Sequence, residues 1–321
     1  MSDFASVIER ARLAFASVAK IESALTRDPG NVALQVNLAA SRKLARKSEE
    51  QIRELSEHKR IDICKYRLVS HLDRAFKIGP VSRSLFEYQN LFSQVYDAIK
   101  NGVKGRAQVG AEAALESALE LAYTYNGSLG FALIAHSDRD FFDGKLDKPI
   151  DVLFEITDAS NRDSIREVAA NYGNSVVKRL YDWSKANLDG QFSTDVQWTR
   201  SDGRRIGKFI DNNTLVDIVN LIAAASDEKR AEHHVRGILI GGDLRSGTFH
   251  FVVPNGDDYR GSIAASFDNA AVMTLGREYL ALISARTKIV YATEKVEVRY
   301  ELEALWEPSD PKSTAHPTSH E

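Results

Sequence analysis

Residues 119–136 read LELAYTYNGSLGFALIAH, with an apolar segment on each side of Asn126-Gly127-Ser128. Asparagine followed by glycine is a strong signal for a tight turn, because both residues tolerate a positive φ. The stretch therefore predicts two consecutive strands joined by a hairpin turn. Because helical patterns flank this strand pair on both sides, the sequence indicates a mixed α+β protein.

The segments around the hairpin continue this mixture of elements. Residues 61–68 alternate apolar and polar side chains, as a half-buried strand does. A wide apolar face predicts a core helix over 82–101, and the small polar residues of 103–112 predict a loop. Downstream, the same reasoning predicts helices at 148–158, 162–187 and 215–222, and a strand pair at 192–198 and 205–210.

The first segment of the chain reads as an antiparallel helical hairpin of coiled-coil type. An apolar stripe runs over 4–25, Pro29-Gly30 ends the first helix, and a weakly striped second helix follows over 32–57. The stripe is more extensive than this second helix can cover, which predicts self-association through residues 1–57. Residues Arg42, Lys43, Arg46 and Lys47 form a basic cluster, which we interpret as a solvated face because four glutamates follow it.

The last segment is predicted to be mostly β. Strand patterns occur at 235–240, 247–253, 259–264, 278–292 and 295–305, with a short helix near 267–275. Five strands in so short a stretch predict a small, strongly bent barrel of SH3-like or OB-like type. The expected domains are therefore a hairpin at 1–58, an α+β domain at 59–230, a barrel at 231–306 and a disordered tail at 307–321.

The composition of the chain indicates the compartment and the kinds of partner to expect. The chain has 321 residues, a net charge of −3 and a single cysteine, Cys64, which excludes an intramolecular disulfide and fits a reducing compartment. No apolar run approaches the roughly 18 residues that suggest a membrane span. We therefore expect a cytoplasmic protein that does not associate with membranes. Without an overall basic charge, we do not expect nucleic acid as a partner.

One patch resembles a catalytic motif. Gly127-Ser128-Leu129-Gly130 followed by Ser137-Asp138-Arg139-Asp140 is similar to the Gly-Ser then Asp-x-Asp arrangement of the nucleotidyltransferase superfamily. The resemblance implies that Ser128 receives a nucleotide triphosphate and that Asp138 and Asp140 hold Mg²⁺. The spacing is one residue short, and a strand pattern follows the turn where the family begins a helix. Asp195 is a formal candidate for a third carboxylate, but a hairpin turn with a solvated acidic loop is favoured.

Three other patterns have structural interpretations. Gly203 to Lys208 has too few residues between its glycines for a phosphate-binding loop and falls in a predicted strand pair. His233, His234 and His250 lack the accompanying motif of a metal site, so surface or cross-strand positions are favoured. Cys64 lies inside a strand pattern and is expected to be a packed thiol. We therefore expect no metal or cofactor unless the nucleotidyltransferase hypothesis holds.

The stretch 80–156 also resembles uncharacterised bacterial proteins in which a long apolar helix precedes a strand pair with a Gly-Ser-Leu/Phe-Gly junction. The resemblance extends to a small C-terminal barrel and implies a bacterial, cytoplasmic origin without an activity. The leading hypothesis is a non-enzymatic binding or assembly protein that oligomerises through its first helices and has a ligand or protein partner. The alternatives are a nucleotidyltransferase-like enzyme and a nucleic-acid-associated factor, the latter resting on the basic cluster and the barrel.

Overall fold

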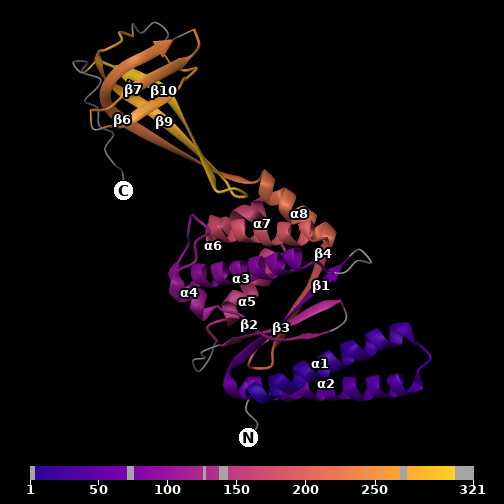
Figure 1. Ribbon diagram of the computed structural model, residues 1–321. Coiled ribbons are helices and arrows are strands. Elements are labelled where there is room, and N and C mark those ends of the chain that lie inside the picture. Colours follow the sequence, from indigo (N-terminus) through magenta and orange to yellow (C-terminus); the bar gives the residue numbers. More distant parts are fainter. Residues whose placement is uncertain are drawn as a thin grey trace. The chain divides into compact units, whose positions relative to one another are not determined.

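The chain forms two compact units in a computed structural model, Met1–Ala225 and Ser226–Glu321 (Figure 1). The structure describes residues 4–70, 76–125, 128–136, 144–243, 245–254, 256–267 and 273–307. The first unit contains the helical hairpin, a sheet and further helices, and the second is a β-barrel.

The first unit is built on a five-stranded antiparallel sheet. Its strand order is β2-β3-β1-β4-β5, so β1 is central and β5 is an edge strand. The strands are β1 (Ile61–Ser70), β2 (Glu120–Tyr125), β3 (Leu129–His136), β4 (Phe192–Thr199) and β5 (Arg205–Ile210). The antiparallel pairing of β2 with β3 confirms the first predicted strand pair, of whose turn Asn126 and Gly127 lie outside the described residues. The pairing of β4 with β5 confirms the second.

Helices cover one face of this sheet (Figure 1). They are α3 (Ile78–Asn101), α4 (Ala111–Glu116), α5 (Asp147–Ile156), α6 (Arg162–Tyr172), α7 (Asn174–Asp189) and α8 (Asn212–Ala224). Buried aromatic side chains fix α3 and α7 to the strands. The Trp183 indole donates to the Tyr66 hydroxyl at 3.0 Å, and the Trp198 indole donates to the Tyr88 hydroxyl at 2.9 Å. Both indole N–H groups are thereby satisfied inside the core, where Ser84 and Asn187 also hydrogen-bond with the Tyr66 hydroxyl.

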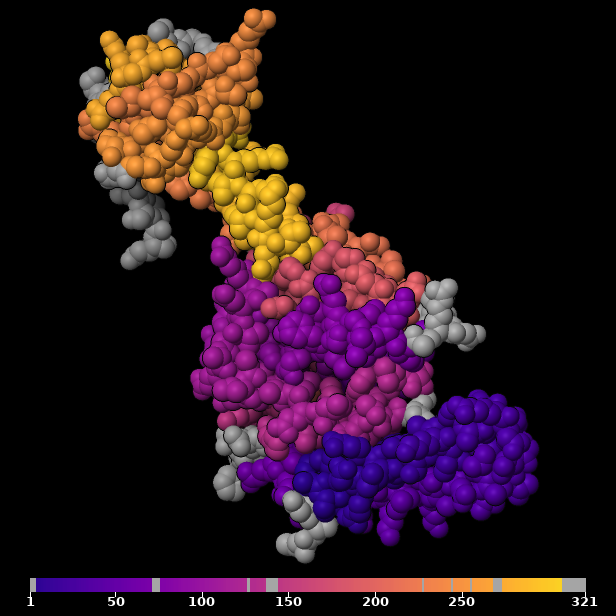
Figure 2. Space-filling view, in the orientation of Figure 1, coloured from indigo at the N-terminus to yellow at the C-terminus, as the bar shows by residue number. Residues whose placement is uncertain are grey.

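The helical hairpin packs on part of the opposite face. It consists of α1 (Phe4–Arg27) and α2 (Val32–Lys59), and Asn31 caps α2 by accepting the Leu34 amide at 3.1 Å. Near its base, Val7 of α1 and Ile52 of α2 share a core cluster with Ile61, Ile63 and other sheet residues. The sheet therefore buries the beginning of the α1 stripe, and farther along Val18 packs against Ala45 of α2. The far end of the hairpin extends past the sheet (Figures 1 and 2).

The second unit is a closed barrel with strand order β10-β8-β7-β6-β9. The strands are β6 (Ser226–Asp243), β7 (Thr248–Val252), β8 (Asp258–Ile263), β9 (Glu278–Val290) and β10 (Lys295–Trp306). Parallel pairing of β10 with β8 closes the barrel, and Leu239, Phe251, Ile283 and Leu302 are fully buried inside. The predicted five-stranded barrel is confirmed, although β6 begins well before the predicted strand.

Two predicted boundaries in the first unit were wrong. The single helix predicted over 162–187 is divided into α6 and α7 at Gly173, where φ is +95°. A Cβ on Gly173 would lie 2.6 Å from the Lys104 carbonyl oxygen, so this crossing of two chain segments requires glycine. The loop predicted over 103–112 ends early, because α4 begins at Ala111. Residues 268–272 of the helix predicted near 267–275, and residues 308–321 of the predicted tail, lie outside the described residues.

Candidate functional site

The face of the sheet opposite α3 and α7 carries charged side chains. Along β1, Cys64 and Tyr66 point into the helix-covered core, so Lys65 and Arg67 point to the other side. The register places Lys65 opposite Gln197 and Arg67 opposite Asp195 on β4. Since directly paired residues of an antiparallel sheet share a face, these four polar side chains form one surface.

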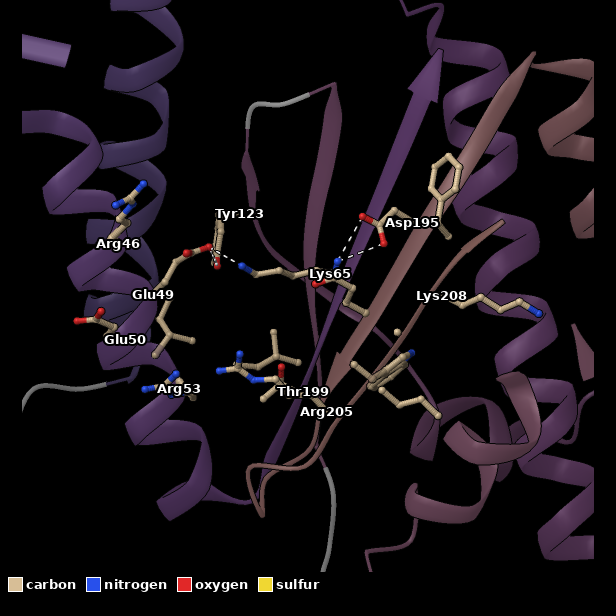
Figure 3. Close-up of a pocket in the computed structure, with 17 residues that line it drawn as sticks. Arg46, Glu49, Glu50, Arg53, Lys65, Tyr123, Asp195, Thr199, Arg205 and Lys208 are labelled. Atoms are coloured by element: carbon tan, nitrogen blue, oxygen red, sulfur yellow. Dashed lines mark hydrogen bonds and ion pairs between the residues drawn. The ribbon is translucent and has the colours of Figure 1, made fainter. Parts of the chain in front are cut away.

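Helix α2 stands over this surface and encloses a cleft of about 630 Å³ with it (Figure 3). The cleft lies between α2 on one side and strands β1, β2, β4 and β5 on the other. Its charged lining residues are Arg46, Glu49, Glu50, Arg53, Lys65, Asp195, Arg205 and Lys208. A volume of this size is within the usual range of small-molecule sites, about 300–1,000 Å³.

Two ion pairs neutralise part of the charge of the cleft residues. Lys65 contacts Glu49 of α2 at 2.8 Å, and the Tyr123 hydroxyl donates to the same carboxylate at 3.3 Å. Burial, together with the Glu49 carboxylate, raises the pKa of Tyr123, which stays protonated as a donor. Arg67 contacts Asp195 at 2.6 Å. These four charged residues therefore neutralise one another in pairs.

Three guanidinium groups of the cleft have no such partner. Within the part of the chain that the structure describes, Arg46, Arg53 and Arg205 form neither an ion pair nor a side-chain hydrogen bond. Arg46 and Arg53 are seven residues apart, so they lie on the same side of α2 at about 10.5 Å along its axis. Arg205 is on β5, across the cleft from them (Figure 3). Among the described residues that line the cleft, Glu50 carries the one carboxylate without an ion pair, so the unpaired positive groups outnumber the unpaired negative one.

Lys208 is among the residues that line the cleft, but its ammonium group lies on the other side of the sheet. Its side chain points away from α2 in Figure 3. The ammonium group donates to the Thr157 carbonyl oxygen at 2.9 Å and pairs with Asp158, on the helix-covered side of the sheet. The excess positive charge of the cleft therefore comes from the three arginines.

The edge strand β5 adds an aromatic surface. Phe209 is 54% exposed although it is part of a strand, and it lies opposite Asp195 on the cleft face. Two residues earlier, Gly207 lies opposite Gln197, and its missing side chain leaves the strand backbone open to the cleft. A Cβ on Gly207 would lie 3.0 Å from Cγ of Gln197.

The residues proposed from the nucleotidyltransferase resemblance fall in different places. Ser128 occupies a turn with φ of +82°, and strand β3, not a helix, begins at the next residue. Asp138 and Asp140 lie outside the described residues. Asp195 faces the cleft but is paired with Arg67. The motif's second glycine has a packing role, because a Cβ on Gly130 would overlap the ring of Tyr125 on the neighbouring strand.

The histidines, the segment from Gly203 to Lys208 and the basic cluster of α2 were the other candidates considered from the sequence. His250 contacts Asp258 at 2.6 Å on the barrel, and the described residues contain no group of three potential metal ligands. Gly203 to Lys208 forms the β4–β5 turn and the start of β5. In the basic cluster, Arg42 pairs with Glu22 of α1 at 2.8 Å, whereas Arg46 lines the cleft.

The cleft was not predicted from the sequence, because its lining residues come from five elements, α2, β1, β2, β4 and β5. The signal that could have indicated it is the charged side of the strand 61–68. Comparisons with protein-family models, with curated proteins and with solved structures find no match for this chain. Among the described helices, none is both long and apolar enough to cross a bilayer.

Proposed function

We propose that this chain is a non-enzymatic binding protein, and that the cleft between α2 and the open face of the sheet holds an anionic, phosphate-bearing ligand. The observation that supports the proposal is the set of three unpaired guanidinium groups, Arg46, Arg53 and Arg205, at one cleft. Among the described residues, Lys65 and Arg67 on this face each pair with a carboxylate, and the ammonium group of Lys208 pairs with Asp158 on the other side of the sheet.

Guanidinium groups are well suited to this role. Their planar fork of N–H donors matches phosphate oxygens in pairs, and they remain charged at any physiological pH. Two of the three groups are on a helix and one is on a strand, so a ligand between them is held from both sides. Like charges facing a shared space also repel one another, and an anion would relieve that repulsion.

The experiment is a calorimetric titration of the full chain with inorganic pyrophosphate at low ionic strength. Charge-assisted hydrogen bonds contribute about 1.5–3 kcal/mol each, so Arg205→Gln should weaken binding by at least about tenfold. Arg83→Gln is the matched control, because Arg83 is an exposed arginine of α3 that does not line the cleft. Absence of pyrophosphate binding, or equal weakening by both substitutions, would overturn the proposal.

A further inference from the structure

The exposed phenylalanine at the cleft is not explained by an anion alone. Phe209 is on the edge strand β5, is 54% exposed and lies on the same face as Arg205. An apolar ring left open to water in a strand gains nothing for folding from its exposed part. Its position beside a cationic cleft gives the ring a second use, as a surface on which a planar group stacks.

The spacing along β5 separates a charged end from an aromatic end. Arg205, Gly207 and Phe209 alternate on the cleft face, so Arg205 and Phe209 are about 13 Å apart at a strand rise of about 3.3 Å per residue. Between them, Gly207 has no side chain to obstruct a ligand lying along the strand. Arg53 of α2 lies at the same end of the cleft as Arg205, whereas Arg46 lies on the other side of the Glu49–Lys65 pair (Figure 3).

The polar residues next to Phe209 can form hydrogen bonds with the edge of a heterocycle that stacks on its ring. Asp195 lies directly opposite Phe209, and Gln197 lies opposite Gly207. The Gln197 amide donates to Asp195 at 3.2 Å, which leaves its carbonyl oxygen as an acceptor at the cleft. A planar ring stacked on Phe209 therefore meets hydrogen-bonding groups at its edge and guanidinium groups at the far end of the molecule.

We infer that the ligand of this cleft is a nucleoside phosphate, with its base stacked on Phe209 and its phosphates bound by Arg205 and Arg53. This inference rests on the proposed function and specifies its ligand. Stacking of a base on an aromatic side chain contributes about 1–3 kcal/mol, so the base should add about tenfold to the affinity of the phosphates.

The test compares ADP with inorganic pyrophosphate by calorimetry on the full chain, in the wild type and in Phe209→Ala. The wild type should bind ADP about tenfold more tightly than pyrophosphate. Phe209→Ala should reduce ADP affinity to that of pyrophosphate and leave pyrophosphate affinity unchanged, which also shows that the variant is folded. Phe86→Ala is the matched control: Phe86 is 63% exposed on α3, does not line the cleft, and its substitution should change neither affinity.

The possible failures are distinguishable. If the wild type binds pyrophosphate and ADP equally, or if Phe209→Ala leaves ADP affinity unchanged, the nucleoside inference is overturned while the anion cleft stands. If neither compound binds, the proposed function and the inference are overturned together.

Discussion

Lys65 on β1 and Glu49 on α2 form an ion pair of 2.8 Å that crosses the cleft and joins the helical hairpin to the sheet (Figure 3). Below this pair, the apolar cluster around Ile52 and Ile63 fixes the base of the hairpin. The pair leaves both side chains partly exposed, so its contribution to the free energy of unfolding is about 1 kcal/mol or less. Its larger consequence is that Glu49 offsets one cation of the cleft.

Removing that carboxylate should strengthen anion binding. In Glu49→Gln, Lys65 becomes an additional cation facing the cleft, and we expect pyrophosphate affinity to rise about fivefold, the effect of about 1 kcal/mol of charge interaction. Glu54→Gln is the control, since Glu54 is an exposed glutamate of α2 that does not line the cleft. Weaker binding by Glu49→Gln in the calorimeter would contradict this assignment of charges.

The close approach of Tyr125 to Gly130 predicts a coupled pair of substitutions. Gly130→Ala should lower the free energy of unfolding by about 2 kcal/mol, because the new Cβ displaces the Tyr125 ring. In a Tyr125→Ala background the same substitution should cost much less, since the ring is absent. Urea denaturation of the four proteins gives the coupling energy. Additive effects would show that Gly130 is required for another reason.

Burial of the thiol and phenol groups in the core predicts sensitivity to alkali. Burial raises the pKa of Cys64 from 9.0 to about 12 and that of Tyr66 from 10.0 to about 12. The unfolded chain therefore releases these protons at a lower pH than the folded chain. Their contribution to stability is complete below pH 9 and is lost as the pH rises towards 12.

The measurement is the urea midpoint as a function of pH. We expect a constant midpoint just below pH 9 and a decline above it, with a shallower decline in Cys64→Ala because one titrating group is gone. A midpoint that rises with pH in this range, or an identical decline in Cys64→Ala, would contradict the stated cause.

Self-association through residues 1–57 stays a prediction, with a different surface from the one first expected. The beginning of the α1 stripe is buried by the sheet, but Val32 and Val36 of α2 are 70% and 63% exposed on adjacent turns. We expect the full chain to form a dimer through this end of the hairpin and Val36→Lys to be monomeric by light scattering. Leu115→Lys, at an exposed leucine of α4, is the control. A monomeric wild type at tens of micromolar, roughly the range of weak dimers, would refute the expectation.

Local patterns were enough to predict most elements of the fold. The alternation over 61–68 predicted β1, and Asn126-Gly127 predicted the β2–β3 hairpin, because both depend on neighbours in sequence. The division of α6 from α7 could not be predicted in the same way. Gly173 is required there by the approach of Lys104, a contact between residues far apart in the chain.

The candidate site depended even more on distant contacts. Arg46 belongs to a basic cluster that we interpreted as a solvated face, and the pattern from Gly203 to Lys208, which contains Arg205, has too few residues between its glycines for a phosphate-binding loop. The two come together because β1 pairs with β4, β4 pairs with β5, and α2 lies over that part of the sheet. In the motif Gly127-Ser128-Leu129-Gly130, Ser128 occupies a turn before β3 and Gly130 packs against Tyr125, while Gly127 lies outside the described residues.

The most direct test of the anion cleft is hydrogen–deuterium exchange of the full chain with and without saturating pyrophosphate. β5 is an edge strand, so ligand binding beside it can slow exchange that the free protein allows. We expect added protection in α2 around Arg46 to Arg53 and in β5 from Arg205 to Phe209, with little change in the barrel. Protection confined to the barrel, or to α2 without β5, would contradict the anion cleft.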